Sequence, residues 1–136
     1  MTRRGQSLVE MALILPLLLA LALGAAQLVR LAVMRSGLDA ATAAAAAAAA
    51  RAPSAATAVS AGSAAFAGVA AGFGLDPSTP VAITSGDFRR GGTIVASAAT
   101  EVGLGFSGIP ALGTRWRLQS SGSARIEDWR SRPPAP

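Results

Sequence analysis

The pattern of apolar and polar positions divides the chain into an apolar first part and a mixed second part. From Leu8 to Val29 every residue is apolar except Glu10 and Gln27. As an α-helix this run is roughly 33 Å long, which matches the hydrocarbon thickness of a bilayer. Arg3-Arg4 precede the run and favour a cytoplasmic N-terminus, although other arginines follow it. The pattern predicts a single transmembrane helix over residues 6–29.

The helical pattern continues beyond the membrane segment as an alanine-rich stalk helix over residues 30–52. Alanine has the highest helix propensity, and the second half of this stretch contains little else. Gly37 lowers the helix propensity, and Ser36 and Asp39 have the spacing of a capping box. The sequence therefore predicts a bend at Gly37, or a break there followed by a new helix. Pro53 ends the element.

A second alanine-rich helix is predicted over residues 54–71, with Ser54 as its N-cap. The residues that follow it, Gly72-Phe73-Gly74, stop the helix. Its large apolar side chains recur at spacings of three and four, and these are Phe66, Val69 and Phe73. Such a spacing forms one apolar stripe, which we interpret as part of the core.

Beyond Pro80 the period of the apolar positions changes to two, which is typical of strands. We expect a short strand over residues 81–85, a returning strand over 93–102 and a loop over 103–113. The last strand alternates most clearly. Its expected buried face carries Trp116, Leu118, Ser120, Gly122, Ala124 and Ile126. Its expected solvent-facing side carries Arg115, Arg117, Gln119, Ser121, Ser123, Arg125 and Glu127.

These elements predict an α+β fold: a long transmembrane and stalk helix, a second alanine-rich helix and a small three-stranded antiparallel sheet. The helix and sheet after the stalk are expected to form one extracytoplasmic domain over residues 53–130. The proline-rich residues 131–136 are expected to be disordered. At 136 residues the chain has room for one such domain beside a membrane helix.

A short motif stands at the start of the apolar run. Gly5 is followed by Gln6-Ser7-Leu8-Val9-Glu10, and a carboxylate at this place is costly in a bilayer. The motif resembles the processing site of type IV-like prepilins. Together with the apolar residues up to Leu19, it resembles more narrowly the start of TadE/TadG-type minor pseudopilins, which belong to the tight-adherence (Flp) pilus systems.

The resemblance implies that a prepilin peptidase cuts between Gly5 and Gln6 on the cytoplasmic face. Residues 1–5 would then be a leader, and Glu10 would become the fifth residue of the mature chain. The family has a proline at the place of Pro16, which implies a helix kink used in assembly, although prolines are common in membrane helices generally. The implied partners are other pilin or pseudopilin subunits and the Tad membrane platform.

The role that the resemblance implies for Glu10 has a physical basis. Cleavage after Gly5 frees an α-amino group on Gln6, which is positive near neutral pH. In a packed helical bundle, the Glu10 carboxylate of one subunit can meet that amine on its neighbour and so give the assembly a register. The simpler alternative is an interfacial glutamate that reaches back to the lipid headgroups and has no role in assembly.

Two other interpretations of the N-terminal segment stay open. Arg3-Arg4 also fits a loose twin-arginine signal, with Gly24-Ala25-Ala26 as a small-residue cleavage site before Gln27, which would release a secreted domain. Alternatively, the chain stays a single-pass anchored protein with no pilus role. Glu10 interrupts the apolar region that a signal peptide needs, and no turn signal follows Ala26. Both features favour the pilin-like interpretation.

The composition argues against a catalytic or metal-binding function. The sequence contains no His, Cys, Tyr, Lys or Asn, and its seven carboxylates stand singly apart from Glu127-Asp128. Adjacent residues on a strand point to opposite faces, so this pair is a poor metal clamp or acid–base dyad. We expect no enzyme activity, catalytic residue, metal, cofactor or small-molecule substrate. The net charge of +5 is spread thinly, and we expect no nucleic-acid partner.

Overall fold

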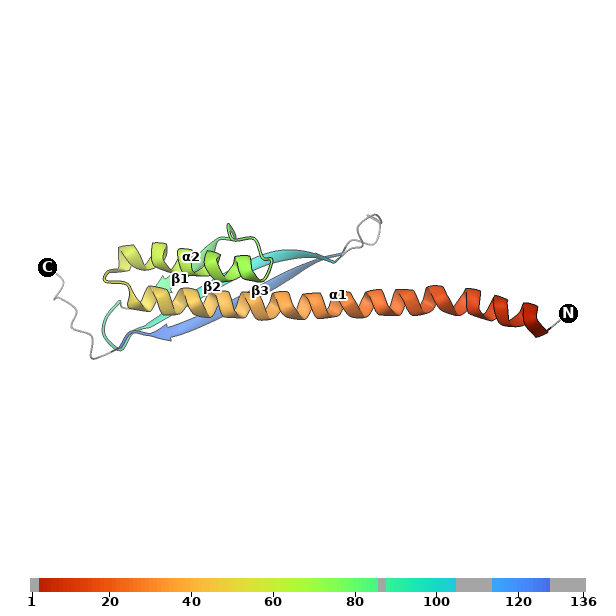
Figure 1. The fold of residues 1–136 in the computed structure, drawn as a ribbon. Coiled ribbons are helices and arrows are strands. Elements are labelled where there is room, and N and C mark those ends of the chain that lie inside the picture. Colours follow the sequence, from red (N-terminus) through yellow and green to blue (C-terminus); the bar gives the residue numbers. More distant parts are fainter. Residues whose placement is uncertain (1–2, 86–87, 105–113, 128–136) are drawn as a thin grey trace. The chain divides into compact units, whose positions relative to one another are not determined.

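The computed structural model describes residues 3–85, 88–104 and 114–127 (Figure 1). Its elements, in chain order, are α1 (Arg3–Arg51), α2 (Ala55–Gly72), β1 (Val81–Ser85), β2 (Thr93–Leu104) and β3 (Thr114–Arg125). Two helices and a three-stranded antiparallel sheet confirm the predicted α+β fold class. The predicted disordered tail, residues 131–136, and most of the predicted loop over 103–113 lie outside the described residues.

The chain divides into two compact units, Met1–Ala32 and Val33–Pro136. The first unit contains the N-terminal part of α1, and its large apolar side chains are exposed. Met11 and Leu13 are each 72% exposed, and Leu17 is 70% exposed. A continuous apolar surface of this kind is unfavourable in water and favourable in the hydrocarbon of a bilayer. The first part of α1 therefore suggests membrane anchoring.

Among the described residues, two helices are long and apolar enough to cross a membrane, Val9–Arg51 and Ala55–Gly72. The second of these is α2, and its buried residues recur at every fourth position: Ala58, Gly62, Phe66 and Ala70. This spacing defines one helix face, which packs inside the second unit. We therefore assign α2 to the core of that unit and not to the membrane.

α1 continues through Gly37, so the predicted break and new helix start at this position are wrong. A Cβ atom at Gly37 would lie 2.5 Å from the Cβ and Cγ atoms of Phe73, which follows α2. The glycine therefore serves the packing of Phe73 on α1. Asp39, predicted to belong to a capping box, instead forms an ion pair with Arg35 at 3.5 Å, one turn earlier on the same helix face.

α2 begins where the sequence predicts. The backbone N–H of Thr57 donates to Oγ of Ser54 at 3.3 Å, and the backbone N–H of Ser54 donates to Oγ1 of Thr57 at 3.2 Å. This capping box gives partners to two backbone donors at a helix start, where intrahelical acceptors are missing. Ser54 is thus confirmed as the N-cap, and the start of α2 is determined by local sequence.

The three strands form an antiparallel sheet in the order β1-β2-β3. β2 and β3 pair along their whole length, from Thr93 opposite Arg125 to Leu104 opposite Thr114. β2 therefore extends two residues beyond the predicted 93–102. β1 is short and pairs only with residues 94–98 of β2.

One face of the sheet is buried, and the buried residues of β2 lie at alternate positions: Ile94, Ala96, Ala98 and Val102. Phe66 of α2 is 1% exposed, which confirms it as core, whereas Phe73 is 38% exposed at the end of α2.

On β3, Leu118 is buried as predicted. The expectation for Trp116 is wrong, because its side chain is 52% exposed. Trp116 shares the face of Leu118 but lies nearer the end of the strand.

The connection from α2 to β1 contains a local turn from which we predict a titration effect. The Asp76 carboxylate accepts hydrogen bonds from the hydroxyl of Ser78 at 2.6 Å and from the backbone N–H of Ser78 at 2.8 Å. These bonds favour the charged form and lower the pKa of Asp76 below its usual 3.8. We expect Ser78→Ala to raise this pKa in a carbon NMR titration of the full chain in micelles.

The sign of the pH effect follows from the lowered pKa. The turn is stabilised above the pKa that Asp76 has in the unfolded chain, and this contribution is lost as pH falls through the folded value. Ser63→Ala is the matched control, because the Ser63 hydroxyl donates to the Val59 carbonyl within α2, away from the Asp76 turn. An equal Asp76 titration in the wild-type protein and in Ser78→Ala would contradict the assignment.

Candidate functional site

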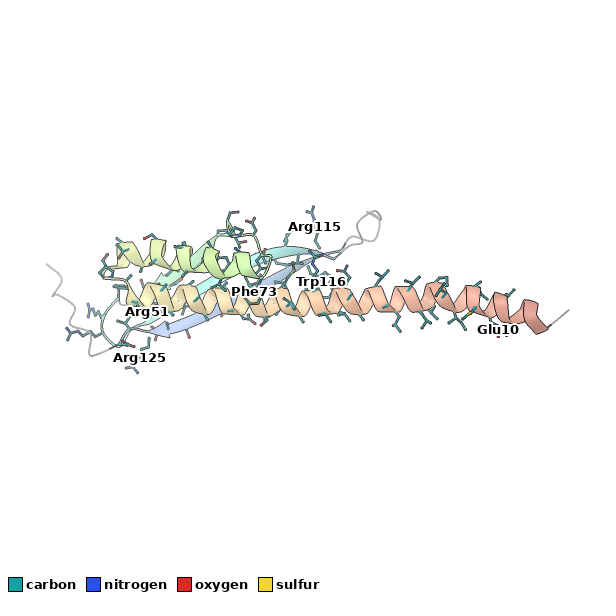
Figure 2. The ribbon with its side chains drawn as sticks, in the orientation of Figure 1. Glu10, Arg51, Phe73, Arg115, Trp116 and Arg125 are labelled. Carbon is teal, nitrogen blue, oxygen red and sulfur yellow. The ribbon has the colours of Figure 1, made fainter. Side chains whose placement is uncertain are left out.

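The residues of the predicted processing and assembly site lie near the start of α1. Gly5 and Gln6 belong to its first turns, and Glu10 follows Gln6 by four residues, about one helical turn. The Glu10 side chain is exposed (Figure 2), and its neighbour Met11 is 72% exposed. The helix thus presents Glu10 at its surface, one turn from the predicted new N-terminus.

Pro16, the predicted kink, lies inside α1. Because its ring nitrogen carries no hydrogen, the helix lacks the usual bond to the carbonyl of Ala12. α1 nevertheless continues to Arg51, so this one missing bond does not end the helix. The role of Pro16 as a kink used in assembly stays a prediction.

A group of polar side chains joins α1 to β3 inside the second unit. Thr42 is fully buried, and its hydroxyl oxygen lies 3.0 Å from the Leu38 carbonyl oxygen. Its Oγ1 also lies 3.1 Å from Oγ of Ser120. The Ser120 hydroxyl donates in turn to Oδ1 of Asp39 at 2.5 Å. Because the single hydroxyl hydrogen of Ser120 goes to Asp39, Thr42 is the donor where the two hydroxyls meet. Because a buried hydroxyl is costly without a partner, this chain of bonds holds α1 and β3 in one register.

Gly122 lies where the backbone of β3 comes close to the backbone of α1. A Cβ atom at Gly122 would lie 2.6 Å from the carbonyl carbon of Thr42 and from the backbone nitrogen of Ala43. Only a glycine fits there, since both neighbouring atoms belong to the backbone of a regular helix. Gly122 and Ser120 therefore form the seam on which the sheet meets α1.

Sequence reasoning placed Ser120 and Gly122 on the buried face but assigned them no role, and it missed Thr42. A glycine inside an alternating strand is the signal that indicates a close backbone approach. For Thr42 the signal is weaker, because it is one hydroxyl within an alanine-rich helix. These three residues position the sheet and take no part in the predicted processing site.

An open hollow of about 890 Å³ lies on the second unit, where Arg35 and Asp39 of α1 and Arg117 and Gln119 of β3 contribute polar groups to its lining. Within the described part of the chain, no three His, Cys, Asp or Glu side chains gather in a metal-binding group. The polar residues that line the hollow can form hydrogen bonds and carry charge. We assign no catalytic reaction to the hollow.

The comparisons with known proteins point to the N-terminal helix. Residues 5–51 match the family model described as TadE-like protein. This segment starts at Gly5 and ends at Arg51, the last residue of α1, so it contains the whole predicted processing and assembly site. No curated protein and no solved structure matches the chain. The family match concerns the N-terminal segment alone, and residues 52–136 lie outside it.

Proposed function

We propose that the chain is a minor pseudopilin of a Tad (Flp) pilus system, because residues 5–51 match the TadE-like family model. In this proposal a prepilin peptidase cuts the bond between Gly5 and Gln6, and the mature subunit joins a pilus or a secretion apparatus. The family match is the observation that carries the proposal. The exposed apolar surface of α1 supports it, because a pseudopilin is anchored in the membrane before assembly.

Assembly in this proposal uses the charge pair formed by processing. The cut frees the α-amino group of Gln6, four residues before Glu10. An axial stagger of about 6 Å between neighbouring helices then brings the amine of one subunit to the carboxylate of the next. In hydrocarbon this pairing is strongly preferred to two separate charges, so it selects one stagger among the many that a smooth apolar helix allows.

The proposed topology is a single pass through the cytoplasmic membrane, with the N-terminus inside and the second unit outside. Arg3-Arg4 support this orientation through the positive-inside rule. The proposed partners are the prepilin peptidase, other pilin or pseudopilin subunits and the Tad membrane platform. The proposed role is structural, without catalysis, because the sequence contains no His, Cys or Lys for acid–base or nucleophilic work.

The test of processing is the N-terminal mass of the protein purified from its native membrane. We expect the wild-type protein to begin at Gln6, and the same mass shows whether Gln6 is methylated or cyclised. In Gly5→Leu the bulky side chain crowds the scissile bond, and we expect only the uncut precursor. A correctly shortened Gly5→Leu protein would remove the processing assignment.

Gly24→Leu is the matched control for the alternative cleavage site. Signal peptidases need small residues shortly before the cut, so a leucine at residue 24 blocks release before Gln27. We expect this variant to begin at Gln6, as the wild-type protein does. A wild-type protein that begins at Gln27 would identify a secreted domain, and one that begins at Met1 or Thr2 would identify a membrane-anchored protein.

A further inference from the structure

The contacts between β3 and α1 show at which end of the second unit Trp116 lies. Ser120 bonds to Asp39, and Gly122 packs against Thr42 further along the helix, so β3 and α1 run in the same direction. Trp116 precedes Ser120 by four residues, about 13 Å along a strand. Asp39 lies only about 9 Å beyond Val33 along the helix. Trp116 therefore lies at the end of the unit where α1 enters it.

This end of the second unit is close to the membrane surface by chain connectivity. The second unit begins at Val33, and the apolar run that we assign to the bilayer ends at Val29. Only three residues separate Val29 from Val33 in the sequence, so even a fully extended chain keeps the two within about 14 Å of each other. Groups at this end of the unit therefore lie within reach of the lipid headgroups.

The side chains at this end have the chemistry of a membrane interface. Trp116 is 52% exposed, whereas Val102 opposite it is 5% exposed and Leu118 is 6% exposed. Arg115 and Arg117 are exposed on either side of the tryptophan. Tryptophan is enriched at the headgroup level because its ring is apolar and its N–H is polar, and arginine binds lipid phosphates.

The arginine side chains at this end of the unit favour binding to an anionic surface. Arg117 lies opposite Glu101 across the strand pair, whereas Arg115 lies opposite Gly103, so an acidic residue faces only one of the two. The nine residues that join β2 to β3, 105–113, carry no charged side chain in the sequence. Figure 2 shows Arg115 and Trp116 at one end of the sheet and Arg125 at the other.

We propose that the Trp116 end of the second unit docks on the anionic phospholipid headgroups of the membrane that α1 crosses. Trp116 lies at the level of the headgroups, and Arg115 and Arg117 bind their phosphates. The proposal rests on the membrane anchoring within the proposed function and needs neither processing nor pilus assembly, so the N-terminal mass and the lipid experiment can fail independently.

The experiment uses the full chain with Trp129→Phe, which leaves Trp116 as the only tryptophan. The protein is reconstituted at low density in phosphatidylcholine–phosphatidylglycerol vesicles. We expect blue-shifted emission, quenching by lipids brominated at shallow acyl positions, and protection from iodide relative to a soluble tryptophan amide. Emission like that of the amide, with full quenching by iodide, would overturn the proposal. Protection that appears only at high protein density would also overturn it, because the end would then bind a second copy.

A tryptophan placed at the other end of β3 distinguishes two orientations of the second unit. In one the unit docks by its Trp116 end, and in the other it lies flat on the membrane. Ser123→Trp, combined with Trp116→Phe and Trp129→Phe, places the reporter on the exposed face near Arg125. We expect this tryptophan to be accessible to iodide and unaffected by brominated lipids. Equal lipid quenching at both positions would mean a flat orientation and would overturn docking by the Trp116 end.

Neutralising the arginines tests the headgroup specificity. The pair Arg115→Gln and Arg117→Gln is expected to weaken docking about 30-fold in vesicles that contain phosphatidylglycerol and to change little in pure phosphatidylcholine. The matched control is Arg89→Gln with Arg90→Gln, two adjacent arginines between β1 and β2, which should leave the Trp116 signal unchanged. An equal loss from both pairs would mean a general charge effect and would overturn the assignment to Arg115 and Arg117.

Discussion

Gly122→Ala is expected to lower the free energy of unfolding of the second unit by about 3 kcal/mol, the upper part of the range for overpacked cores. The added Cβ would lie 2.6 Å from backbone atoms of Thr42 and Ala43. Neither atom can move without distorting α1, so β3 must shift and stretch the bonds that join Ser120 to Asp39 and Thr42. Denaturant unfolding of the full chain in micelles, followed by tryptophan fluorescence, measures the loss.

Gly68→Ala is the matched control for this prediction. Gly68 lies on the exposed side of α2, and apart from its chain neighbours and its own helix backbone no described heavy atom lies within 4 Å of the place of its Cβ. The same chemical change should stabilise the unit there by about 0.5–1 kcal/mol, because alanine has the higher helix propensity. Unchanged stability of Gly122→Ala would mean that β3 does not approach α1 as closely as the seam requires.

Glu10→Gln is expected to reduce incorporation of the subunit into pili at least about tenfold, while insertion into the membrane stays intact. Glutamine keeps the size of the side chain and removes its charge. The α-amine of Gln6 on a neighbour then lacks a counter-charge in a surrounding where an unpaired charge is costly. A tenfold loss corresponds to about 1.4 kcal/mol per contact. Quantitative immunoblotting of sheared pili against the membrane fraction measures the ratio.

Two controls make the Glu10 result specific. Glu127→Gln removes a carboxylate from the exposed residue that follows Ile126, far along the chain from α1, and should leave incorporation unchanged. The N-terminal mass of the Glu10→Gln protein should still begin at Gln6, which separates assembly from processing. Normal piliation by Glu10→Gln would remove the assembly role and leave Glu10 as an interfacial glutamate.

The elements that the sequence predicted well are those determined by neighbours along the chain. The long apolar run and the alanine-rich stretch predicted α1, because helix propensity and apolar length act over a few turns. Ser54 predicted the start of α2, because a cap bonds to residues only three positions away. The strand alternation predicted which side chains of β3 face inward from Leu118 onward. The roles of Gly5, Gln6, Glu10 and Pro16 stay predictions, because each involves a second molecule.

The tertiary structure alone decided how these elements meet. Gly37 was expected to bend or break the helix, but the helix continues through it and Phe73 from the end of α2 packs against it. Trp116 was expected in the core, but it lies beyond the buried part of β3. The hydrogen bond between Thr42 and Ser120 joins residues 78 positions apart. Apolar periodicity states which face of an element is buried, whereas the partner of that face depends on long-range contacts that local sequence does not encode.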